Sequence, residues 1–204
     1  MLLYDSKAGT NPKKVRIFLA EKGMSVERTF VDLAANGQDA PDYRAVNSLG
    51  LLPALKLDDG TVITESVAIC RYFEAVQPAP ALFGTNAREI ALIDMWIRRI
   101  ELEVFYPAIM AFKSDSAFFA GRGHPQNKDF ADAMRAVAAD KLRWLDGELA
   151  DGRPYAAGEA FSMADIVAMA CFAIHKGAGV TVPDDVTHYH AWRERLSARP
   201  SMAA

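Results

Sequence analysis

One stretch of the chain organises the rest: it reads LGLLPAL over residues 49–55 and TES over residues 64–66. Because a proline inside a central strand would remove a ladder hydrogen bond, Pro53 is expected to open a strand. The Asp-Gly pair at residues 59–60 is a strong hairpin signal, and the chain should return from it as a second strand. The stretch therefore predicts a β-hairpin that leads into a helix at Ser66.

Two features of this hairpin suit a small acidic peptide as ligand. The bond before a proline is the one peptide bond whose cis form costs little, and a cis Pro53 would turn the backbone of Leu52 outward. The Leu52 N–H and C=O groups could then pair with an extended peptide as an added strand. At the start of the next helix, Ser66 and the free N–H groups favour a carboxylate. A purely structural interpretation stays open, in which Glu65-Ser66 is a helix cap and Pro53 an edge turn.

The ordered set of residues in this region resembles the glutathione-binding half of the cytosolic glutathione transferases. The residues that carry the resemblance are Asn47, Gly50, Leu52, Pro53, Leu55, Glu65, Ser66, Ala68, Ile69, Arg71 and Tyr72. The resemblance implies an α/β thioredoxin-like N-terminal domain and an all-α helical C-terminal domain, the glutathione transferase fold. It also implies that Glu65 and Ser66 hold the γ-glutamyl amine and carboxylate of glutathione. Leu52, next to Pro53, would pair with the cysteinyl backbone.

Composition and charge argue against nucleic acid and membranes as partners. The 204 residues carry a formal net charge of -3 and no long basic run, which gives no electrostatic case for nucleic acid. No apolar run approaches the roughly 18 residues of a spanning helix, and the first residues lack a signal-peptide plan. Cys70 and Cys171 lie far apart in apolar helical patterns, so buried thiols are expected rather than a disulfide. These features predict a cytoplasmic protein without a membrane partner.

Residues 1–77 are expected to form the thioredoxin-like domain. An apolar run at residues 2–4 predicts the first strand, and Asn11 before a proline reads as the N-cap of the first helix. Gly23 should end that helix, and residues 26–33 resemble a second strand. Strand, helix and strand in this order predict a parallel unit with a right-handed crossover.

A proline-punctuated break marks the domain boundary, with a linker at residues 78–86 and an all-helical domain at residues 87–204. Apolar residues recur at helical spacing along residues 93–104, which predicts a long helix. Ser162 and Asp165 have the spacing of a capping box at the start of a buried helix. The resemblance gives this box a role in folding rather than in the site.

The loop after the first strand departs from the family pattern. Glutathione transferases stabilise the glutathione thiolate with a Tyr, Ser or Cys near this loop, and the usual Ser/Cys slot here holds Gly9. Thr10 is the first choice for this role, because a hydroxyl beside a helix N-terminus favours thiolate over thiol. Asn11 is the second choice and Ser6 the third, whereas Tyr4 lies within the strand and should be packed. The loop therefore resembles a bacterial Ser/Thr/Asn type rather than the Tyr or Cys types.

The family resemblance also implies a pocket for the second substrate. Phe105, Tyr106, Met110 and Phe112 form an aromatic-rich stretch near the end of the long helix, where the family binds its electrophile. The alternative, that these side chains fill the helical core, has equal standing for each of them. No metal site is expected, because the sequence shows no cluster of ligands.

The resemblance implies a glutathione S-transferase with a role in detoxification. Glutathione would be a co-substrate, its thiolate attacking a small hydrophobic electrophile or a peroxide, and the protein would form a symmetric homodimer. The alternative is a noncatalytic glutathione-transferase-like module that binds a ligand or a protein partner.

Overall fold

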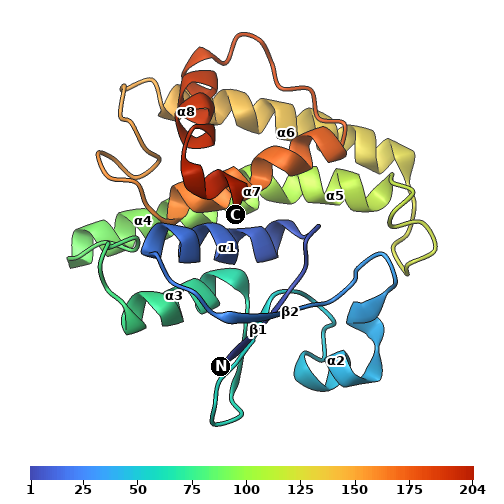
Figure 1. Ribbon diagram of the computed structural model, residues 1–204. Coiled ribbons are helices and arrows are strands. Elements are labelled where there is room, and N and C mark those ends of the chain that lie inside the picture. The colour runs from blue at the N-terminus through green and yellow to red at the C-terminus, as the bar shows by residue number, and fades with distance from the viewer. The chain divides into compact units, whose positions relative to one another are not determined.

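The computed structural model describes residues 1–204, which fold as two compact units. The first unit comprises Met1–Leu82 together with Pro200–Ala204, and the second comprises Phe83–Arg199 (Figure 1). The chain passes from one unit to the other inside the stretch expected to be a linker, residues 78–86. The last five residues belong to the first unit, where η3 (Pro200–Ala203) packs on α1 (Thr10–Lys22) and Ser201 donates to Glu21.

A four-stranded mixed sheet forms the first unit, with the strand order β2-β1-β3-β4. Its strands are β1 (Leu2–Asp5), β2 (Glu27–Phe30), β3 (Ala54–Lys56) and β4 (Val62–Thr64). β1 pairs in parallel with β2 and antiparallel with β3, and β3 and β4 form the expected hairpin. α1 and α3 (Ser66–Val76) pack together, and their apolar faces join the sheet in a core that includes Leu3, Phe18, Leu55, Ile69 and Phe73. The thioredoxin-like expectation is confirmed.

The predicted second strand, residues 26–33, is longer than the observed one. β2 ends at Phe30, and the Asp32 side chain accepts the backbone N–H of Ala34 at 2.8 Å. This local side-chain bond offers the backbone an alternative to the ladder, which ends the strand early. A short segment, η1 (Gly37–Asp39), and the helix α2 (Pro41–Val46) then lead to the hairpin.

The start of α1 differs from the expectation. The N-cap is Gly9 rather than Asn11, which is the second helical residue, and no side chain caps this end. Pro12 is tolerated as the third residue because the first N–H groups of a helix have no partner within the helix. Gly23 ends the helix as expected, in the left-handed region with φ 62°, and donates its N–H to Ala20.

The end of α1 also fastens the segment that follows α3. The Lys22 ammonium is buried and donates to the carbonyls of Gln77 at 2.8 Å, Pro78 at 3.2 Å and Pro80 at 2.5 Å. It also forms an ion pair with Glu74 at 2.5 Å. A buried cation is tolerated when paired and hydrogen-bonded, so the proline-rich segment has a fixed path.

The second unit is all helical, as expected. It consists of α4 (Ala87–Arg99), η2 (Ile100–Phe105), α5 (Tyr106–Ser114), α6 (Lys128–Glu148), α7 (Met163–Gly177) and α8 (Thr187–Ser197). The predicted long helix is present, but η2 is a π-helical segment that separates α4 from α5. α7 is apolar on nearly every side and packs against α4, η2, α5 and α8 (Figure 1). No helix of the protein has the length and apolar character needed to span a membrane.

The start of α7 confirms the predicted capping box of Ser162 and Asp165. The buried Asp165 carboxylate accepts the Ser162 backbone N–H at 3.0 Å and the Ser162 hydroxyl at 3.1 Å. It also accepts the Ala156 N–H at 2.8 Å and the Trp192 Nε1–H at 3.1 Å. Burial raises the pKa of Asp165 to about 6, although these hydrogen bonds favour the charged form. One carboxylate therefore joins α7, α8 and the loop before α7.

Candidate functional site

The register of the sheet brings three predicted site segments to one end of the first unit. Tyr4 of β1 pairs with Ala54 of β3, and Ala54 pairs in turn with Thr64 of β4. Because both pairings are antiparallel, the end of β1, the start of β3 and the end of β4 lie at the same sheet end. The loop at residues 6–9, the Leu52-Pro53 corner and the Glu65-Ser66 corner follow directly from these strand ends.

The corner before β3 presents an unused backbone. The Leu52–Pro53 bond is cis, as expected, and no hydrogen bond engages the backbone N–H or C=O of Leu52. The preceding carbonyl, that of Leu51, is held in place by the Tyr43 hydroxyl at 2.5 Å and the Asn47 amide at 2.7 Å. Tyr43 and Asn47 thus hold the corner in place, and the N–H and C=O groups of Leu52 remain available for hydrogen bonds with a ligand.

The corner after β4 has a strained backbone. Glu65 has φ 67°, in the left-handed region that is uncommon for a residue other than glycine. Such residues cost about 1–3 kcal/mol and cluster at ligand-binding sites. The interpretation of Ser66 as a helix cap is wrong, because Glu65 holds the cap position and no side chain caps α3. Ser66 is the first helical residue, only 6% exposed, and its hydroxyl makes no hydrogen bond within the chain.

The loop after β1 is held by a buried ion pair. Asp5 accepts the Ser6 N–H at 2.7 Å and the Arg16 guanidinium at 2.7 Å, and Arg16 also donates to the Ser6 carbonyl at 2.8 Å. Ser6 itself is only 3% exposed, whereas Thr10 and Asn11 are half-buried at the first two positions of α1. No hydrogen bond within the chain engages the Thr10 or Asn11 side chain.

Sequence reasoning missed the groups that support these segments. The Asp5–Arg16 pair has no signature in the sequence, because the partners are eleven positions apart and meet through the turn between strand and helix. Asn47 belongs to the sequence pattern of the site, but only the tertiary structure shows that its amide donates to the Leu51 carbonyl. The Tyr4 ring packs against Tyr43 at 5.6 Å between centroids, which confirms that Tyr4 is a packed residue. Burial raises the pKa of Tyr43 to about 12.

The residues expected to bind the electrophile all lie in the second unit. Phe105 ends η2, and Tyr106, Met110 and Phe112 belong to α5. Tyr106 is 53% exposed, and the other three are half-buried, so none is a fully buried core residue. The Phe112 ring packs edge-on against Phe119 at 5.5 Å. Their part in a pocket stays a prediction.

Cysteine chemistry and metal binding have little support among the side chains. Cys70 and Cys171 are buried and form no disulfide, and burial raises the pKa of the Cys70 thiol. Neither cysteine lies in the loop after β1. No group of three or more His, Cys, Asp and Glu side chains is arranged to hold a metal ion.

Comparisons with known proteins give the family of this chain. A family model described as the glutathione S-transferase N-terminal domain matches residues 10–76, and one described as the C-terminal domain matches residues 97–200. "Glutathione S-transferase 2" of Saccharomyces cerevisiae is 36% identical over 99% of this chain and 88% of its own length. The crystal structure of Gtt2 from S. cerevisiae has a TM-score of 0.92 at 35% identity and covers 100% of this chain and 99% of that one.

A glutathione transferase homologue from Sulfitobacter, solved with bound glutathione, has a TM-score of 0.81 at 26% identity. That similarity covers 99% of this chain and 94% of the homologue. Both halves of the chain match, and the relatives match over nearly their whole length. This chain belongs to the glutathione S-transferase family.

Proposed function

We propose that this protein is a glutathione transferase that binds glutathione at the sheet end described above and uses its thiolate as a nucleophile. The observation that carries the proposal is the pair of unused groups there: the free backbone of Leu52 and the unbonded hydroxyl of Ser66. The first suits the cysteinyl backbone of glutathione, and the second, at a helix N-terminus, suits its γ-glutamyl carboxylate. The Glu65 carboxylate would bind the γ-glutamyl amine.

The fixed geometry of the site supports this assignment. Binding costs less free energy when the receptor groups are already in position. Tyr43 and Asn47 hold the Leu51 carbonyl, so Leu52 needs little ordering when an extended peptide pairs with it. The strain at Glu65 is likewise consistent with a backbone shaped for a ligand rather than for stability.

Thr10 is our choice for the group that stabilises the thiolate. It is the first residue of α1, half-buried, with a side chain that no hydrogen bond engages. A hydroxyl donor and the N-terminal N–H groups of the helix would both favour a sulfur anion. Asn11 lies one residue further on and is the second choice. Ser6 ranks third because it is almost fully buried.

Immobilised glutathione and a generic aryl halide test the proposal together. The expected result is retention on the resin, elution by free glutathione and turnover of the halide. Retention without turnover would favour the noncatalytic alternative, for which the missing Tyr, Ser or Cys at the position of Gly9 is the specific observation. Failure to bind glutathione would overturn the site assignment.

The thiolate role has its own measurement. In Thr10→Ala, the pKa of bound glutathione should rise and conjugation should slow, while the affinity for glutathione changes little. Absorbance of the bound thiolate as a function of pH reports this pKa directly. Asn11→Ala is the matched variant: an unshifted titration in Thr10→Ala and a shifted one in Asn11→Ala would move the role to Asn11.

The second substrate would be a small hydrophobic electrophile or a peroxide, bound with the help of Phe105, Tyr106, Met110 and Phe112. We also propose a two-fold symmetric homodimer, the commonest arrangement of soluble oligomers. The helix α3, which carries Cys70 and Arg71, is the candidate contact with the first long helix of the second unit of a partner. Sedimentation should give a dimer, and a monomer at every concentration would rule this arrangement out.

A further inference from the structure

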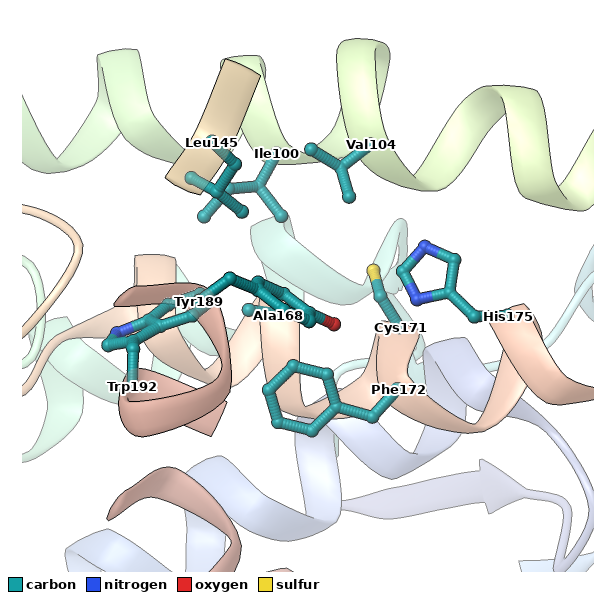
Figure 2. Close-up of a pocket in the computed structure, with 9 residues that line it drawn as sticks. All are labelled: Ile100, Val104, Leu145, Ala168, Cys171, Phe172, His175, Tyr189 and Trp192. Carbon is teal, nitrogen blue, oxygen red and sulfur yellow. The ribbon is translucent and has the colours of Figure 1, made fainter. Parts of the chain in front are cut away.

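A small cavity lies inside the second unit, and none of the residues assigned to the glutathione site lines it. It measures about 10 Å³ and is lined by nine side chains of η2, α6, α7 and α8 (Figure 2). All nine residues are buried. A volume of about 10–15 Å³ is the lower limit for one enclosed water molecule, and it is far too small for an organic ligand.

The cavity wall is apolar except at a few atoms. His175 of α7 and Tyr189 of α8 are 2% and 1% exposed, and neither ring nitrogen of His175 nor the Tyr189 hydroxyl has an aligned hydrogen bond. Figure 2 shows the Tyr189 oxygen directed toward Cys171 and the His175 ring. The indole N–H of Trp192, on the same wall, is satisfied because it donates to Asp165. The unused polar atoms therefore converge on one side of the cavity.

The charge state of His175 decides what these atoms can bind. Burial lowers the pKa of His175 to about 4, and the Val104 carbonyl nearby opposes part of this lowering. The ring is therefore neutral at pH 7, with one nitrogen that donates and one that accepts. Tyr189 remains a neutral phenol because burial raises its pKa. A neutral donor and acceptor pair suits an uncharged ligand with the same capacities.

We propose that this cavity binds one buried water molecule, held by the Tyr189 hydroxyl and a ring nitrogen of neutral His175. Buried waters occur where otherwise unsatisfied polar groups face a space of this size, and they make about three hydrogen bonds. The Val104 carbonyl, in the π-helical segment η2, lies close to the His175 ring and favours a proton on it. The water would join α7 and α8 through His175 and Tyr189.

A crystal structure of the full chain, determined with and without xenon pressure, tests the proposal directly. The expected result is density for one water within hydrogen-bond distance of the Tyr189 oxygen and a His175 nitrogen, unchanged by xenon. Xenon enters dry apolar cavities, so xenon density at this place in the unmodified protein would overturn the proposal. An empty cavity would overturn it as well.

Tyr189→Phe gives an independent test in solution. If a water binds the hydroxyl, its loss should lower the midpoint of thermal unfolding by about 2–4 °C. If the cavity is dry, the variant removes an unsatisfied buried hydroxyl and the midpoint should rise. Tyr43→Phe is the matched control, since that hydroxyl bonds to the Leu51 carbonyl at 2.5 Å and its loss must lower the midpoint. A rise in Tyr189→Phe beside a fall in Tyr43→Phe would overturn the proposal.

Discussion

Two helices of this protein have a serine at their start, as the N-cap of α7 and as the first residue of α3, and the hydrogen bonding of the two serines is opposite. At the start of α7, Ser162 and Asp165 satisfy each other, and Asp165 further accepts two donors from other segments. At the start of α3, Ser66 has no partner in the chain and follows a residue with a strained backbone, Glu65. The first arrangement lowers the free energy of the fold, whereas the second leaves donors available for a ligand.

This difference shows why residue type and position do not distinguish a folding signal from a binding site. Serine is favoured at the N-cap, and from the sequence alone both Ser66 and Ser162 could be caps, although only Ser162 is one. What separates them is whether the hydrogen-bonding capacity is already used. A helix start with unused capacity and local strain has a cost that stability alone does not explain.

The largest effect is expected from removal of the Asp165 carboxylate. Asp165→Ala should lower the free energy of unfolding by about 3–4 kcal/mol, because it leaves the buried N–H groups of Ala156, Ser162 and Trp192 without an acceptor. Chemical denaturation measures this loss. Asn127→Ala is the control, an exposed N-cap of α6 whose loss should cost about 1 kcal/mol. If both variants lose the same free energy of unfolding, Asp165 stabilises the fold no more than an ordinary N-cap does.

His175, near the other end of α7, should make the stability of the protein depend on pH. The folded-state pKa of His175, about 4, lies below its ordinary value of 6.5, so the unfolded chain binds more protons between these values. Stability attributable to neutral His175 is therefore present above about pH 6.5 and is lost as the pH falls toward 4. The lowering of the pKa corresponds to about 3 kcal/mol.

The measurement compares the unmodified protein with His175→Gln by denaturation at several pH values. Asp165, with its pKa raised to about 6, changes stability in the opposite direction over this range, since its folded form binds the extra proton. Both proteins contain Asp165, so its contribution cancels in the difference between them. That difference should move in favour of the variant as the pH falls from 6.5 to 4. A constant difference would contradict the buried neutral state of His175.

The two serines provide a matched pair of variants. Ser66→Ala should weaken glutathione binding by about 1–3 kcal/mol, for loss of one charge-assisted contact, and leave the unfolding midpoint unchanged. Ser162→Ala should lower stability by about 1 kcal/mol and leave the affinity for glutathione unchanged. Calorimetry and thermal unfolding measure both quantities for each variant. If Ser66→Ala lowers the unfolding midpoint and keeps its affinity for glutathione, Ser66 has a structural role rather than a binding role.

The smallest expected effect is relief of strain at Glu65. Glycine adopts a φ of 67° without penalty, so Glu65→Gly should raise the free energy of unfolding by about 1 kcal/mol. The same variant should bind glutathione more weakly, because the carboxylate is gone. Glu65→Ala loses the carboxylate but keeps the strain, so it should show weaker binding without the gain in stability. If both variants have the same stability, the backbone at Glu65 is not strained.

Local patterns in the sequence were enough for most of the fold. The hairpin of β3 and β4, the C-cap at Gly23 and the capping box at Ser162 all depend on residues a few positions apart, and all are present. The family resemblance supplied the pairing of a thioredoxin-like domain with a helical one. It also supplied the candidate ligand groups, because their order and spacing are themselves local.

Other features depend on groups distant in the sequence, and only the tertiary structure decided them. Asp165 meets Trp192, Lys22 meets the segment after α3, and the last five residues return to α1. The start of α1 at Gly9, the π-helical turn of η2 and the backbone of Glu65 were not predicted either. Periodicity and capping preferences describe a residue's neighbours along the chain. Whether a polar group finds a partner, or is left open at a site or a cavity, depends on what packing brings against it.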